Sequence, residues 1–159
     1  MQPENLTEIL KKHPFLSTLE DKYVDTLLSC ASNVTFNEGD YLFREGEEAT
    51  KFYLIRSGKI GLELHASERG MIRIQTISAG EVLGWSWLIS PYRWHFDAVA
   101  VESVRAFALD GKCLRTKTED NHDFGYEMFK RFSQILENRI KATRLQLLDV
   151  YGLNRVERG

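Results

Sequence analysis

The middle of the chain, residues 33–110, is a succession of short apolar runs, and this pattern constrains the fold more than any other feature. The runs are interrupted by glycines at Gly39, Gly46, Gly58 and Gly61. The segment MIRIQTI alternates apolar with charged or polar residues, and DAVAVESVRAFALD is again rich in Val and Ala. Short strands with turn residues at close spacing predict an antiparallel sandwich or barrel.

Helical patterns flank this region on both sides. LTEILKKHPF ends at a proline, and STLEDKYVDTLLSCA begins with a capping box in which Ser17 caps and Glu20 follows three residues later. From residue 120 to 150 apolar residues recur every three or four positions, as in a long helix. We therefore predict one α+β, mainly β domain over residues 1–159. It would comprise N-terminal helices (1–32), a jelly-roll β-roll or double-stranded β-helix (33–115) and a long C-terminal helix (120–150).

The composition excludes several classes of protein. The formal net charge of -2 gives no broad basic field for nucleic acid or an acidic membrane. No apolar run approaches the ~20 residues of a membrane span, and the N-terminus lacks the apolar stretch of a signal peptide. Cys30 and Cys113 form no CxxC pair. We expect both to be structural thiols, and the protein to be cytoplasmic.

All three tryptophans, Trp85, Trp87 and Trp94, lie in one short segment, GEVLGWSWLISPYRWHFDAV. Large rings gathered in this way either fill a core or line a pocket. The four histidines are isolated and none pairs at the spacing of metal ligands, which argues against a metal-dependent enzyme of the cupin type.

The order of these parts resembles the cyclic nucleotide-binding domain family, in which short helices precede a β-roll and a long helix follows it. The β-roll motif of that family is matched at Gly46, Phe52, Tyr53, Ile55, Gly58 and Ile60. The tail LQLLDVYG is similar to the end of the long helix in catabolite activator-type regulators. The resemblance implies a regulatory, non-catalytic sensor. Because the sequence ends at Gly159, where those regulators continue into a helix-turn-helix, we expect no DNA binding by this chain alone.

The aromatic segment falls where the family keeps its phosphate-binding cassette. Gly80 and Gly84 match the cassette, but Trp85 stands where the resemblance places a glutamate. Trp94 replaces the arginine that would pair with the phosphate, and Asp97 replaces a Ser or Thr. Losing the partner of a buried charge costs about 2–5 kcal/mol in binding. We therefore expect no ordinary binding of cyclic AMP or cyclic GMP.

Three interpretations of the aromatic segment remain open. The rings fill the former pocket as core, or they line a cage for a planar or cationic small molecule. Alternatively, a cyclic nucleotide still binds through backbone amides and Arg93. A haem sensor with His95 as axial ligand is a further alternative. The resemblance also places Asn138 and Arg139 of the long helix near the ligand, although Arg139 could equally be a solvated or dimer-interface charge.

The candidate ligand pocket therefore combines cassette residues, nearby aromatic and polar residues and two helix positions. They are Gly80, Glu81, Leu83, Gly84, Trp85, Ser86, Trp87, Arg93, Trp94, His95, Asp97, Asn138 and Arg139. The near-heptad pattern of the long helix favours a homodimer, and a partner protein could receive the signal. No catalytic residues, no certain cofactor and no metal ligands are predicted.

Overall fold

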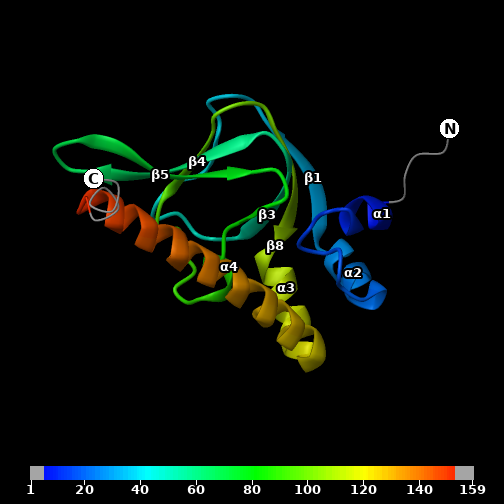
Figure 1. The fold of residues 1–159 in the computed structure, drawn as a ribbon. Coiled ribbons are helices and arrows are strands. Elements are labelled where there is room, and N and C mark those ends of the chain that lie inside the picture. The colour runs from blue at the N-terminus through cyan, green and yellow to red at the C-terminus, as the bar shows by residue number, and fades with distance from the viewer. Residues whose placement is uncertain (1–5, 153–159) are drawn as a thin grey trace.

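The computed structural model describes residues 6–152, in which a β-roll is flanked by helices (Figure 1). The strands are β1 (Ala31–Phe36), β2 (Tyr41–Phe43), β3 (Lys51–Ser57), β4 (Lys59–Ala66), β5 (Gly70–Ser78), β6 (Val82–Leu83), β7 (Asp97–Ala100) and β8 (Val104–Asp110). The helices are α1 (Leu6–Lys11), α2 (Asp21–Leu28), α3 (Gly111–Asp120), α4 (His122–Val150) and the 3-10 turn η1 (Ser86–Leu88). This mainly β arrangement confirms the predicted fold class.

The strands form two four-stranded antiparallel sheets, ordered β1-β8-β3-β6 and β2-β7-β4-β5. Strand β3 is buried on both faces, which explains its nearly continuous apolar sequence. Tyr53 and Ile55 face the core between the sheets, whereas Phe52 and Leu54 join a second core beneath the helices. The β-roll is therefore packed both inside and on its helical side.

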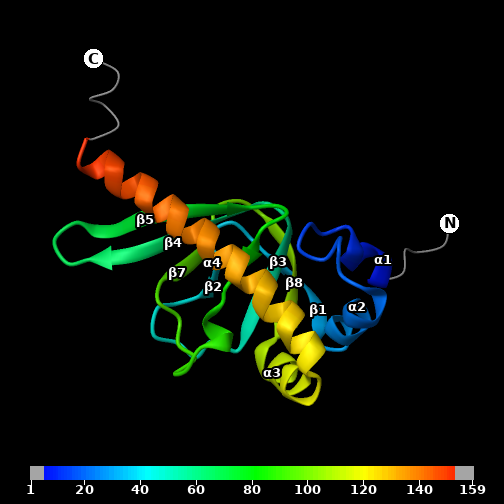
Figure 2. The ribbon, with the colours of Figure 1, turned by 60° about the horizontal axis from the view of Figure 1, so that its bottom comes forward.

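Helix α4 crosses the molecule from α3 to the β4–β5 hairpin (Figures 1 and 2). Its first half is anchored because Phe124, Met128 and Phe132 are buried in the core beneath the helices. In its second half Ile140, Leu145, Leu147 and Val150 are exposed. The apolar stripe of the sequence thus divides into a buried and an exposed part.

Two boundaries differ from those predicted. Helix α2 begins at Asp21 and lacks a side-chain cap; Ser17 instead donates a hydrogen bond to the Pro14 carbonyl at 3.2 Å. The capping-box prediction was wrong because the loop after α1 continues through Ser17. Helix α3 was not predicted, and the expected end of the β-roll at residue 115 falls within it. Its N-terminus is capped by Asp110, whose side chain accepts the Cys113 backbone N–H.

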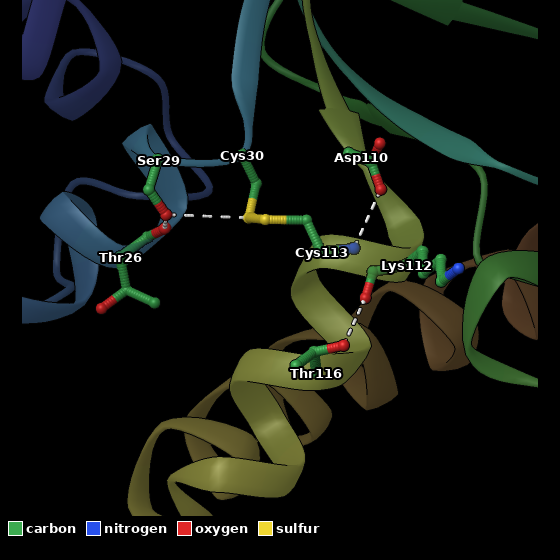
Figure 3. The surroundings of a disulfide bond; sticks show 7 residues. All are labelled: Thr26, Ser29, Cys30, Asp110, Lys112, Cys113 and Thr116. Carbon is green, nitrogen blue, oxygen red and sulfur yellow. Dashed lines mark hydrogen bonds between the residues drawn. A yellow bond between two sulfur atoms is a disulfide. The ribbon is translucent and has the colours of Figure 1, made fainter.

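Cys30 and Cys113 form a disulfide bond, so the prediction of two free thiols was wrong (Figure 3). Cys30 follows α2 and Cys113 lies in the first turn of α3, with the two Cα atoms 5.9 Å apart. Antiparallel pairing of β1 with β8 brings these positions together, since Ala31 pairs with Leu109. A sequence separation of 83 residues gives no sign of this proximity.

Within the described part of the chain, no helix is both long enough and apolar enough to span a bilayer.

Candidate functional site

The first part of the cassette segment contains two positions, Gly80 and Gly84, whose backbone conformation favours glycine. Gly80 and Gly84 have φ values of 88° and 100°, a region that strains residues with a Cβ atom. Gly80 N donates to the Ile55 carbonyl at 2.9 Å, which fixes the turn against β3. A Cβ atom on Gly84 would lie 2.6 Å from a ring carbon of Trp94. Gly84 is therefore required by both the backbone and the neighbouring indole.

Trp94 is a core residue at the position where the resemblance places an arginine. Its side chain is 4% exposed and belongs to the core between the two sheets. The indole stacks on Phe43 with ring centroids 3.7 Å apart and planes 8° from parallel. Packed against Gly84, it fills space with a neutral ring and offers no cation to an anionic ligand.

Trp87 belongs to the other core, beneath the helices. It is fully buried in η1 and stacks on Phe52 at 5.0 Å, with the edge of Phe132 at 5.3 Å. Arg115 of α3 donates to the Trp87 carbonyl at 2.6 Å, which holds η1 against α3. Trp87 thus anchors the cassette and has no access to a ligand within the β-roll.

Trp85 is the tryptophan that borders open space. It is half-buried, meets Phe96 edge-on at 5.9 Å and lies 5.7 Å from the Arg139 guanidinium of α4. At this distance the cation is attracted to the face of the ring. The three tryptophans therefore have two structural roles: Trp87 and Trp94 fill the two cores, and Trp85 borders a space that a ligand could occupy.

Trp85 lines a cavity of about 480 Å³ between the β-roll and α4, here called the inner cavity. The strands contribute Leu62, Leu64, Ile74 and Gln75, the cassette contributes Trp85, His95 and Phe96, and α4 contributes Leu136, Arg139, Ile140, Thr143, Arg144 and Leu147. Its volume and its mainly apolar wall with a few polar groups are typical of small-molecule sites. Gln146 also donates to the Ile74 carbonyl, which ties α4 to β5 beside this cavity.

Arg139 is the principal charge in the wall of the inner cavity. Its Nη2 donates to the Val82 carbonyl at 3.0 Å. Burial lowers the pKa of Arg139, and the negative charge of Glu81 partly offsets this. Because a guanidinium stays protonated in proteins, Arg139 remains a cation here. The hypothesis that it is a solvated charge is wrong, since one guanidinium nitrogen is bonded to the cassette and the other is buried.

Two predicted ligand residues are directed elsewhere. Arg93 is exposed, forms an isolated bridge with Glu48 and donates to the Gly46 carbonyl at 3.3 Å. Arg93 does not line the inner cavity, and its role as an anion ligand stays a prediction. Asp97 is buried, and its carboxylate accepts the Glu45 N–H at 2.7 Å. It therefore fixes the loop before β3, and it does not line the inner cavity.

The remaining predicted ligand residues lie in the core, at the edge of the inner cavity or outside it. Leu83 and Ser86 are buried, and His95 is exposed at the edge of the inner cavity. Gly80, Glu81 and Asn138 lie outside the inner cavity, along a neighbouring one between α4 and the loop after α1. Within residues 6–152 no group of His, Cys, Asp or Glu side chains could hold a metal ion.

Sequence reasoning missed the strand and helix residues that line most of the inner cavity. Leu62 and Ile74 belong to alternating strand patterns, and Leu136, Thr143 and Leu147 belong to the apolar stripe of the long helix. The apolar stripe of the long helix could have indicated the cavity, because a stripe that is longer than the buried core must also line a cavity or an interface. It was interpreted only as core or as a dimer seam.

Comparison with known proteins identifies the family to which this fold belongs. Residues 33–121 match the model of the cyclic nucleotide-binding domain. The chain is 23% identical over 145 residues to a CRP-like cAMP-activated global transcriptional regulator of Mycobacterium tuberculosis, covering 91% of this chain and 63% of the regulator. It is 27% identical over 157 residues to human cGMP-dependent protein kinase 2, covering 97% of this chain and 20% of the kinase. It thus spans under two thirds of each relative's length.

A solved cyclic nucleotide-binding domain from Methylobacillus flagellatus has the same fold, with a TM-score of 0.77 and 19% identity. The match covers 91% of this chain and 81% of that domain. The matched segment contains all the strands from β2 to β8, the cassette and α3. The chain therefore belongs to the cyclic nucleotide-binding domain family.

Proposed function

We propose that this chain is a non-catalytic regulatory domain that binds an apolar, planar small molecule in its inner cavity. It does not hold cyclic AMP or cyclic GMP by a phosphate cassette. The observation that carries this proposal is the stacking of Trp94 on Phe43 against Gly84. A cassette with this neutral ring lacks the forked cation that pairs with a phosphate. Its short 3-10 turn of three residues adds little helix dipole in compensation.

The lining of the inner cavity supports a planar ligand. Trp85 and Phe96 offer ring faces and edges, while Ile74 and Leu136 offer apolar contact. Arg139 and Arg144 place positive charge at the α4 side, which suits a ligand with one electron-rich or anionic group. The alternative that a cyclic nucleotide binds through Arg93 has no geometric support, because Arg93 donates to Gly46 on the outside.

The proposal can be tested with anilinonaphthalene sulfonate, a planar apolar anion whose fluorescence rises on transfer to apolar surroundings. We expect saturable binding that quenches the emission of Trp85. Ile140→Glu, at a half-exposed position of the cavity wall, should weaken binding about tenfold or more. Phe129→Glu is the matched control, since Phe129 lies on the same helix with similar exposure, outside the cavity and outside the exposed end of the helix. Equal loss in both variants would contradict the proposed site.

We also propose that the second half of α4 pairs with a second copy of this chain. Leu145, Leu147, Val150 and Tyr151 are each more than half exposed, an apolar surface that isolated domains seldom leave uncovered. Ligand binding would then be transmitted either through the contact between the two copies or through a partner protein that docks on this surface. In sedimentation experiments the protein should be a dimer, and Val150→Glu should shift it toward monomer.

A cytoplasmic location stays a prediction. The two cysteines no longer support it, because disulfides persist mainly in oxidising compartments and are rare in reducing ones.

A further inference from the structure

A second cavity of about 340 Å³ lies outside the β-roll, and we call it the outer cavity. It is lined by the loop after α1, the start of the cassette segment and α4, and it is open to solvent. Phe15, Val82 and Ile135 supply apolar wall, and Arg131 and Arg139 supply charge. Among the described residues, Arg139 alone is common to the walls of the inner and outer cavities. The outer cavity is therefore a separate space that shares one side chain with the inner one.

Arg131 lines this cavity and has one buried nitrogen without a hydrogen-bond partner among the described residues. Its Nη1 donates to the Phe15 carbonyl at 2.7 Å and its Nη2 donates to Thr18 Oγ1 at 2.9 Å, so the guanidinium is fixed by the loop after α1. Its Nε–H is buried and has no hydrogen-bond partner within residues 6–152. Leaving a buried donor of a charged group unpaired destabilises the folded protein, so an acceptor for this N–H would be favourable.

Arg139, two turns further along α4, likewise has one bonded and one unpaired nitrogen among the described residues. One nitrogen, Nη2, donates to the Val82 carbonyl, whereas Nη1 is buried without a partner in the described chain. Two buried nitrogens, unpaired within residues 6–152, therefore belong to permanently charged side chains that line one cavity. Glu81 also borders it, but its carboxylate accepts the Ser78 backbone N–H at 2.6 Å. The charged side chains of the wall sum to one net positive charge.

We infer that the outer cavity binds a small organic monocarboxylate. The carboxylate oxygens would accept from the free N–H groups of Arg131 and Arg139, which are charge-assisted hydrogen bonds. The apolar body of the ligand would lie against Phe15, Val82 and Ile135. A single negative charge matches the net charge of the wall. The inner and outer cavities share Arg139, and the test therefore uses Arg131 and Gln134, which line the outer cavity and not the inner one.

Benzoate is a suitable probe, and arginine side-chain NMR of the full chain reports on the donor directly. The Nε–Hε signal of Arg131 is identified by its loss in Arg131→Lys. At constant ionic strength, benzoate should shift this signal saturably, because the hydrogen gains an acceptor. Benzamide, which has the same ring without the charge, should leave it in place. A missing benzoate shift, or an equal one with benzamide, would overturn the inference.

Matched charge variants separate a site from a general field. Gln134 is exposed at the edge of the outer cavity, whereas the adjacent Ser133 is exposed outside it. Gln134→Glu should weaken benzoate binding about tenfold by repulsion at close range, and Ser133→Glu should change it less than twofold. Because both positions are on the surface of α4, both variants should fold. Equal weakening by the two variants would show that no local site exists.

Discussion

Replacing Trp94 with alanine tests whether the ring is structural. The indole is 4% exposed and stacks on Phe43 at 3.7 Å, so its removal leaves a large void between the two sheets. Trp→Ala in a core costs about 3–5 kcal/mol in the free energy of unfolding, of which the ring stack contributes about 0.5–1.5 kcal/mol. We expect a loss in this range in urea unfolding followed by circular dichroism, with an unchanged m-value.

Trp85→Ala is the matched control within the same segment. Trp85 is only half-buried, so we expect a smaller loss of about 1–2 kcal/mol. Neither variant should gain or lose stabilisation by cyclic AMP or cyclic GMP. A Trp94→Ala loss below about 1 kcal/mol would refute the interpretation of this ring as core, and so would a variant with normal melting that has lost cyclic nucleotide binding.

Three further predictions concern other parts of the fold. Gly84→Ala should destabilise the protein by at least about 1 kcal/mol in the same unfolding assay, because its φ is 100° and its Cβ would meet Trp94; an unchanged stability would show that the turn relaxes freely. His13 is held neutral between the Ile55 carbonyl and the Phe15 N–H, and burial lowers its pKa below the ordinary 6.5. The neutral form of His13 therefore stabilises the folded protein fully above pH 6.5, and this contribution is lost as the pH falls below that value. The unfolding free energy should fall by up to about 1.4 kcal/mol per pH unit in this range. His13→Gln should remove this pH dependence in melts at several pH values, and an unchanged dependence would contradict the prediction. Reducing the disulfide, which closes a long loop, should lower the unfolding free energy by about 2–5 kcal/mol, and a reductant that leaves the urea midpoint in place would contradict it.

Features that local sequence determines were predictable. The long helix followed from its apolar spacing, and the β-roll followed from short alternating runs broken by glycines. The helix α3 was not apparent because GKCLRTKTED contains one buried leucine and no apolar stripe. Its stability comes from the Asp110 cap and from packing against α4, which only the folded chain provides.

Features that depend on contacts between distant segments were not predictable. Arg131 lies 116 residues from the Phe15 carbonyl that fixes it, and Cys30 lies 83 residues from Cys113. The direction of the exposed Arg93 was not predictable either, because its position in the chain does not determine the side of the backbone from which the side chain projects in a loop. The different environments of Trp85 and Trp87 depend likewise on η1, a single turn that the sequence does not mark.

The central claim is that neutral rings have replaced the groups that hold a cyclic nucleotide phosphate in this domain. Titration calorimetry of the unmodified protein with cyclic AMP and with cyclic GMP tests this claim most directly. The account predicts no saturable heat at micromolar concentrations of either nucleotide. A dissociation constant in the micromolar range or tighter for either one, at about 8 kcal/mol or more of binding free energy, would contradict it.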